Sequence, residues 1–88
     1  MFVGNVIGTL VANAKYPTLQ GVKLLIVQPL DDAMVAKGEP VVAVDVVGVG
    51  VGERAFCVLG KEAAMALDDP MAPVDVAVVG IVDAVSKE

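Results

Sequence analysis

The segment 41–53, VVAVDVVGVGVGE, constrains the fold of this chain more than any other. It begins as an apolar strand interrupted by a single acid, Asp45, and continues into a loop with glycine at every second position. Glycine permits backbone conformations and close approaches that a side chain would prevent. A second apolar run, AFCVL, follows Glu53 and Arg54. The segment indicates a chain built for tight packing against copies of itself rather than for catalysis.

The composition points in the same direction. A chain of 88 residues has room for one domain, expected over 1–88, and buries only about 60–65% of the surface that its unfolded form exposes. Yet 57% of its residues are apolar, against about 45–50% in ordinary globular domains. A membrane helix would need roughly 18 consecutive apolar residues, and charged or polar residues interrupt every long run. The N-terminus lacks the pattern of a signal peptide. The apolar surplus therefore predicts an obligate oligomer.

The charge balance argues against nucleic acid as a partner. Six basic and eleven acidic residues give a net charge of −5, and the basic residues are scattered along the chain. Nucleic-acid binding depends on a basic face and often on aromatic side chains that stack on bases. Aromatic residues make up only 3% of this chain.

The apolar pattern predicts five strands, one loop and one short helix. The strands are expected at 2–14, 22–30, 41–47, 54–59 and 74–85, the loop at 48–53, and the helix at 61–67. Gly4 and Gly8 allow a bend or bulge in the first strand. The first two strands are apolar on both faces, which predicts that both faces are covered. This order favours an all-β fold, a small closed OB-like barrel with one short helix.

The residue types that catalysis needs are scarce. The chain has no histidine, which excludes histidine-based triads and metal sites. The pairs at 31–32 and 68–69 are typical of solvated turns. Asp45, Asp75 and Asp83 interrupt apolar strands and are expected to face solvent or to bond a neighbouring subunit. Cys57 is expected to be a small buried hydrophobe. We therefore predict no catalytic residue, no metal and no cofactor.

The glycine loop differs from a phosphate-binding loop. Its pattern is G-x-G-x-G-E rather than G-x-G-x-x-G, and a strand rather than a helix follows it. Such a loop suits a narrow axis at which identical chains converge. The residues predicted to line that axis are Gly48, Val49, Gly50, Val51, Gly52 and Glu53.

Four stretches in this order resemble the motifs of one known family. They are GTLVANAK (8–15), GVKLLIV (21–27), VAVDVVGVGVGE (42–53) and PVDVAVVGIVD (73–83). Asn13 stands where the family commonly has threonine, and Val49 where it commonly has alanine. The four stretches together resemble the bacterial microcompartment vertex proteins, the pentameric shell subunits of carboxysomes and of ethanolamine- or diol-utilising organelles.

The resemblance implies a cyclic homopentamer of OB-like barrels that caps the vertices of a cytoplasmic polyhedral shell. It also implies hexameric shell proteins as partners, with no nucleic acid and no membrane. The residues expected to contact neighbouring subunits or the shell are Asp45, Gly60, Lys61, Glu62, Asp75 and Asp83. After the fourth strand the family commonly has G-S-[SA]-A-R, but this chain has GKEAA and lacks the arginine. Lys61 is the residue that would serve in its place.

Two other classes of function remain open at this point. One is an OB-fold binding module for nucleic acid or sugar, against which the acidic charge and the few aromatics count. The other is a small enzyme or transport pore with a ligand site of its own.

Overall fold

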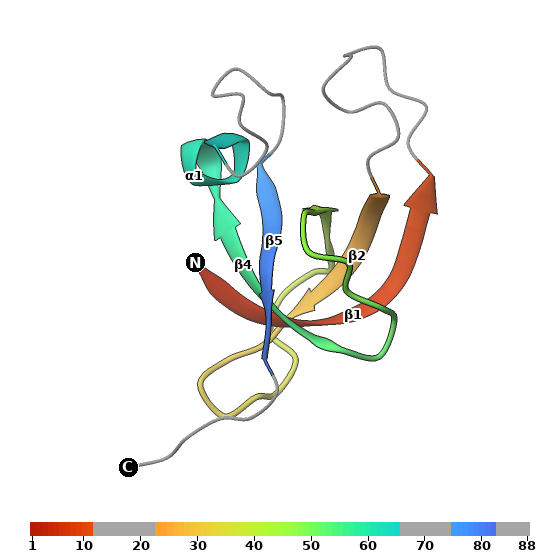
Figure 1. Ribbon diagram of the computed structural model, residues 1–88. Helices are drawn as coiled ribbons and strands as arrows, with labels where there is room; N and C mark the ends of the chain where they lie inside the picture. Colours follow the sequence, from red (N-terminus) through yellow and green to blue (C-terminus); the bar gives the residue numbers. More distant parts are fainter. Residues whose placement is uncertain (12–22, 66–74, 83–88) are drawn as a thin grey trace.

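The computed structural model describes residues 1–11, 23–65 and 75–82, which form a closed β-barrel with one short helix (Figure 1). Its elements are β1 (Phe2–Val11), β2 (Lys23–Pro29), β3 (Val41–Asp45), β4 (Arg54–Leu59), α1 (Gly60–Met65) and β5 (Val76–Ile81). The order around the barrel is β1-β2-β3-β5-β4, and β4 pairs with β1 to close it. Among these strands β3 and β5 pair in parallel and the other neighbours are antiparallel. The predicted closed OB-like barrel is confirmed.

Each element lies where the sequence predicted it, but several boundaries differ: β2 ends at Pro29 rather than at 30, and residues 75 and 82 lie outside β5. β4 has the predicted bounds, and α1 begins one residue earlier than predicted. β3 ends at Asp45 rather than at 47, because the Asp45 carboxylate accepts hydrogen bonds from the backbone amides that follow it and turns the chain. The predicted strand and helix positions 12–14, 22, 66–67, 74 and 83–85 lie outside the described residues.

The bend predicted in the first strand is a β-bulge at Ile7. Val6 pairs with Val27, and Gly8 pairs with the next residue, Ile26, so Ile7 has no partner in that register. Beside the bulge, the Val6 amide donates to the Glu53 carbonyl at 2.9 Å, and the Val6 carbonyl accepts from the Gly52 amide at 2.8 Å. These two hydrogen bonds connect the end of the glycine loop to β1 beside the bulge.

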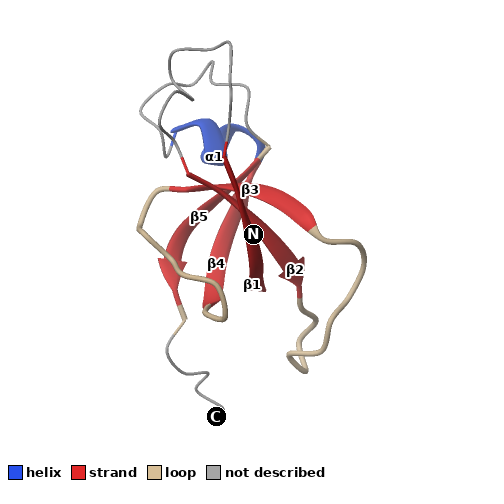
Figure 2. Cartoon of the chain, turned by 90° about the vertical axis from the view of Figure 1, so that its right-hand side faces the viewer, coloured by secondary structure: helices blue, strands red, loops and turns tan. Residues whose placement is uncertain are grey.

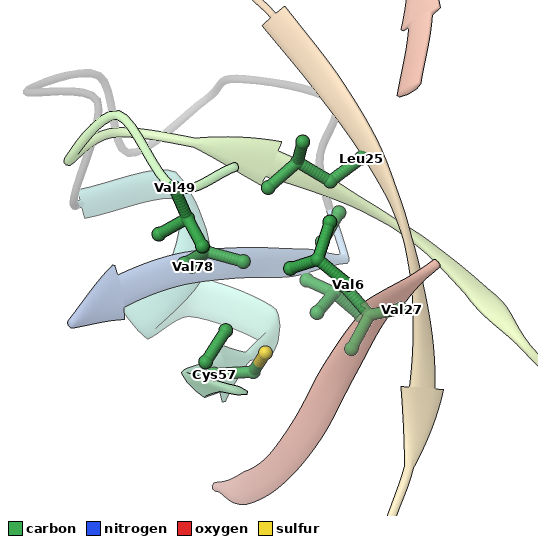
Figure 3. Close-up of a cluster of buried hydrophobic side chains, with 9 residues drawn as sticks. Val6, Leu25, Val27, Val49, Cys57 and Val78 are labelled. Atoms are coloured by element: carbon green, nitrogen blue, oxygen red, sulfur yellow. The ribbon is translucent and has the colours of Figure 1, made fainter. Parts of the chain in front are cut away.

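The core fills the barrel with small and branched side chains (Figure 3). Its fully buried side chains are led by Leu25, Val6, Val27, Val49, Val78 and Cys57. Burial raises the pKa of the Cys57 thiol to about 11, so the group stays protonated at neutral pH and packs as a hydrophobe. The expected role of this residue is confirmed.

The helix covers part of the outside of the barrel. Ala63 of α1 is buried with Val58 of β4 and Ala77 of β5 in a second small cluster. Both views place α1 at one end of the barrel, and the loop between β2 and β3 lies toward the opposite end (Figure 2). The outer faces of β4 and β5 are therefore partly covered within the chain.

Candidate functional site

Asp45 is the anchor of the glycine loop. Its Oδ1 accepts from the amides of Val47 at 3.0 Å and Gly48 at 2.8 Å, and its Oδ2 accepts from the amide of Val49 at 3.0 Å. The side chain is only 1% exposed. An ionised carboxylate tolerates such burial when several donors replace water. The expectation that the Asp45 side chain faces solvent is wrong, because its partners lie within its own chain. The predicted contact of Asp45 with a neighbouring subunit stays a prediction.

Lys23 joins the glycine loop to β2, a role that the sequence analysis missed. Its Nζ donates to the Val49 carbonyl at 3.1 Å and lies 3.9 Å from Asp45 Oδ2. The lysine side chain remains about half exposed, so its ion pair with Asp45 is partly screened by water. A lysine at the start of a largely apolar strand was the signal available in the sequence, but its partner is 26 residues away.

The backbone conformation of the loop explains why glycine occupies two of its three glycine positions. Gly48 has a φ of 87° and Gly52 a φ of 92°, a region that side chains other than glycine rarely adopt. Gly50 has no such φ, and its amide donates to Glu53 Oε1 at 2.7 Å. The predicted need for glycine backbone geometry is therefore met within a single chain at Gly48 and Gly52, which both have a positive φ.

The valines of the loop point in different directions. Val49 is fully buried and points toward Val78 in the core (Figure 3), so its side chain belongs to the barrel interior. Val47 and Val51 are exposed, Val51 by 60%. The loop therefore presents two apolar side chains and the exposed Glu53 to its surroundings.

A continuous apolar surface covers the outside of β1, β2 and β3. The strand register aligns Gly8 with Ile26 and Ile26 with Val42, and it aligns Leu10 with Leu24. Leu10 and Val42 are exposed by 41% and 50%, and Ile26 and Leu24 are half-buried. We call these five residues the outer face. The prediction that the first two strands are covered on both sides is not met within a single described chain, where the outer face is open to solvent.

Four of the other predicted contact residues lie in or beside α1: Gly60, Lys61, Glu62 and Asp75. The Gly60 amide donates to the Asp75 carbonyl at 2.9 Å, which brings those two residues together. Asp75 and Lys61 are exposed. Glu62 lies within α1, and Asp83 lies outside the described residues. The structure therefore groups Gly60, Lys61 and Asp75 where α1 follows β4 and β5 begins.

Other kinds of site were sought in the same residues. Across residues 1–11, 23–65 and 75–82, no three cysteine, aspartate or glutamate side chains gather as the ligands of a metal ion would. In that part of the chain, no helix has both the length and the apolar character needed to cross a bilayer.

Comparison with known proteins gives a consistent result. The family model described as "Ethanolamine utilisation protein EutN/carboxysome" matches residues 1–83. The chain is 46% identical over 88 residues to the carboxysome shell vertex protein CcmL of Synechococcus elongatus, and the match covers 100% of this chain and 89% of that protein.

Two solved structures show the same barrel. The pentameric microcompartment shell protein GrpN from Rhodospirillum rubrum superimposes with a TM-score of 0.87 at 40% identity, covering 100% of both chains. CcmL of Gloeobacter violaceus gives a TM-score of 0.89 at 38% identity, covering 100% of this chain and 91% of that one. These relatives favour a shell protein over an OB-fold binding module. Together with the fold, they show that the chain belongs to the EutN/CcmL family of ethanolamine-utilisation and carboxysome proteins.

Proposed function

We propose that this chain is a structural shell protein that forms pentamers and caps the vertices of a polyhedral bacterial microcompartment. The observation that carries the proposal is the outer face, an apolar sheet surface left open by a barrel whose interior is already filled. Relatives named as shell vertex proteins, and a pentameric structural neighbour, support the same reading. In this role the chain does no chemistry.

The geometry of a ring limits how the outer face can be used. In a cyclic pentamer each contact is heterologous, so a surface of one copy must meet a different surface of the next. A closed barrel leaves few exposed strand edges for pairing between copies, so side-chain packing has to supply the contact. We assign the outer face to one side of that contact. We assign the glycine loop, with its exposed Val47 and Val51, to the region in which the copies converge.

A vertex protein must also contact the hexameric shell proteins that surround it. We assign the exposed end of the barrel that carries Gly60, Lys61 and Asp75 to contacts with hexameric shell proteins. Individual surface ion pairs there contribute only about 0–1 kcal/mol each. Shape fit repeated around the rim therefore dominates the interaction. The compartment, and this chain with it, lies in the cytoplasm.

Replacing Val42 with aspartate tests the outer face. The wild-type chain is expected to show a mass five times that of the 9.0 kDa protomer by light scattering. Val42→Asp is expected to give a folded monomer, because a carboxylate buried without a partner in the contact costs several kcal/mol. Val35→Asp is the matched control, since Val35 is also exposed but lies in the loop between β2 and β3. A wild-type monomer at micromolar concentration would refute the pentamer, and a pentameric Val42→Asp would refute the assignment of the face.

A substitution at Gly50 tests whether the glycine loop lies at the axis on which the copies converge. Because Gly50 does not need a positive φ, a larger residue there adds bulk without the backbone strain expected at Gly48 or Gly52. Gly50→Val is expected to impair assembly, and Val51→Ala is expected to leave it nearly intact, as judged by the pentamer fraction in light scattering. Equal and mild effects would show that the loop is a solvent-exposed connection away from the axis.

Electron microscopy of shells tests the biological role. Shells co-expressed without this chain are expected to be elongated, open or leaky to a small dye, while the enclosed enzymes stay active. Normal closure without it, with no second vertex protein present, would show that the vertex assignment is wrong.

A further inference from the structure

A hollow lies at the start of β1, at the other end of that strand from Gly8 and Leu10 of the outer face. It has a volume of about 280 Å³ and is lined by residues that include Phe2, Val3, Phe56 and Met34. The strand register places Val3 opposite Phe56, and the Leu30 amide donates to the Val3 carbonyl at 2.9 Å. The lining therefore joins β4, β1 and the end of β2. This volume is just below the range of about 300–1,000 Å³ for small-molecule sites, which suits one or two side chains better than a cofactor.

The loop beside this groove is held in a fixed conformation. Asp31 Oδ1 accepts from the amides of Ala33 at 2.9 Å and Val35 at 3.0 Å. The Asp31 amide also donates to the Val35 carbonyl, and the Asp31 carbonyl accepts from the Met34 amide, each at 2.9 Å. Four hydrogen bonds centred on one residue therefore shape the loop, so the groove is preformed.

Met34 is held in this loop at a backbone cost. Its φ is 62°, the left-handed region that glycine or asparagine adopts more readily. A strained residue that persists beside a groove points to a use for its side chain. The methionine side chain is half-buried and lines the groove. Methionine packs well against partners of varied shape.

The charge of the groove indicates the chemistry of its occupant. Asp31 and Asp32 lie in the lining, and Asp32 is exposed. None of the described lining residues is lysine or arginine. An apolar groove with two carboxylates favours an apolar group that is flanked by positive charge.

We propose that this groove is a docking site for a short segment of another protein, with one or two large apolar side chains beside a lysine or arginine. The proposal does not depend on the vertex role, since the groove is complete within one chain. The apolar side chains fill the space between Phe56 and Met34. The basic side chain pairs with Asp32.

A designed peptide tests the proposal on the oligomer as purified. The probe is N-acetyl-Gly-Lys-Leu-Met-Arg-Gly-amide, with one control in which glutamate replaces both basic residues and another in which alanine replaces both apolar ones. The readouts are fluorescence anisotropy of the labelled peptide and the NMR signal of the Met34 methyl group. We expect saturable binding with a Kd on the order of 0.1 mM and a shift of that methyl signal. No saturable binding, or equal binding of the glutamate peptide, would overturn the proposal.

Two variants locate the binding site. Asp32→Asn is expected to weaken binding about two- to five-fold, the effect of one exposed ion pair. Glu39→Gln makes the same charge change outside the groove and is expected to have no effect. Met34→Gly relieves the strained backbone and is expected to weaken binding about ten-fold without loss of thermal stability. Unchanged binding in Met34→Gly would overturn the proposal. A change in oligomer mass in either groove variant would show instead that the groove is a contact between copies of this chain.

Discussion

Gly4→Ala is expected to destabilise the barrel by about 2–3 kcal/mol, the cost of overpacking a filled core. A Cβ at Gly4 would clash with Val27 Cγ1 and would lie 2.9 Å from the Gln28 carbonyl oxygen. Val27 is fully buried, and the oxygen belongs to the backbone of the paired strand, so neither can move away cheaply. Urea unfolding followed by circular dichroism, at one fixed protomer concentration, measures the loss.

Gly8→Ala is the matched control for this change. Its added Cβ would lie 3.3 Å from Ile26 Cδ1, the far end of a flexible side chain on the outer face. We expect the barrel of this variant to keep its stability to within about 1 kcal/mol. If the two variants lose stability equally, close strand packing at Gly4 is not what requires glycine there.

Asp45→Ala is expected to cost about 3 kcal/mol and to loosen the glycine loop. The substitution leaves three backbone amides without their acceptor and removes the carboxylate beside Lys23. Each unsatisfied buried donor costs about 1–3 kcal/mol, reduced here where water reaches the loop. Thermal unfolding and amide hydrogen exchange at 47–49 measure the two effects.

Two further variants separate the contributions at this anchor. Asp45→Asn keeps an oxygen for the amides of Val47 and Gly48 but loses the ionic partner of Lys23, so a smaller loss is expected. Asp32→Ala changes an exposed aspartate in another loop and is expected to change stability by less than about 0.5 kcal/mol. A loss from Asp45→Ala as small as that from Asp32→Ala would show that the glycine loop holds its shape without the carboxylate.

The hydrophobic pattern predicted the strands because each strand signal is local. Alternating and continuous apolar runs, bounded by glycine, proline and aspartate, placed β1 to β5 in their order and α1 between the last two. The glycines at 48 and 52 marked the positions that need a positive φ, since few other residues adopt it. The apolar surplus likewise predicted surface that a single chain leaves open.

The roles of individual side chains depended on partners far away in the sequence. The sequence predicted that the Asp45 carboxylate faces solvent or bonds a neighbouring subunit, because nothing nearby in the sequence shows that the following amides fold back onto it. Val49 read as one more residue of the loop, yet it is buried against β5. Lys23 acquires its role only when β2 and β3 pair and bring it to the Val49 carbonyl.

The sequence by itself therefore determined the positions of the strands along the chain, the closed barrel and the family, since periodicity, turn residues and motifs are properties of neighbouring residues. Only the tertiary structure decided which side of each strand is covered and which polar group has a partner. A register shift of one residue at Ile7 changes the side on which the following residues of β1 face. That shift leaves Leu10 beside Leu24 on the outer face and holds Val6 in the core, a result of pairing between distant segments that no local pattern contains.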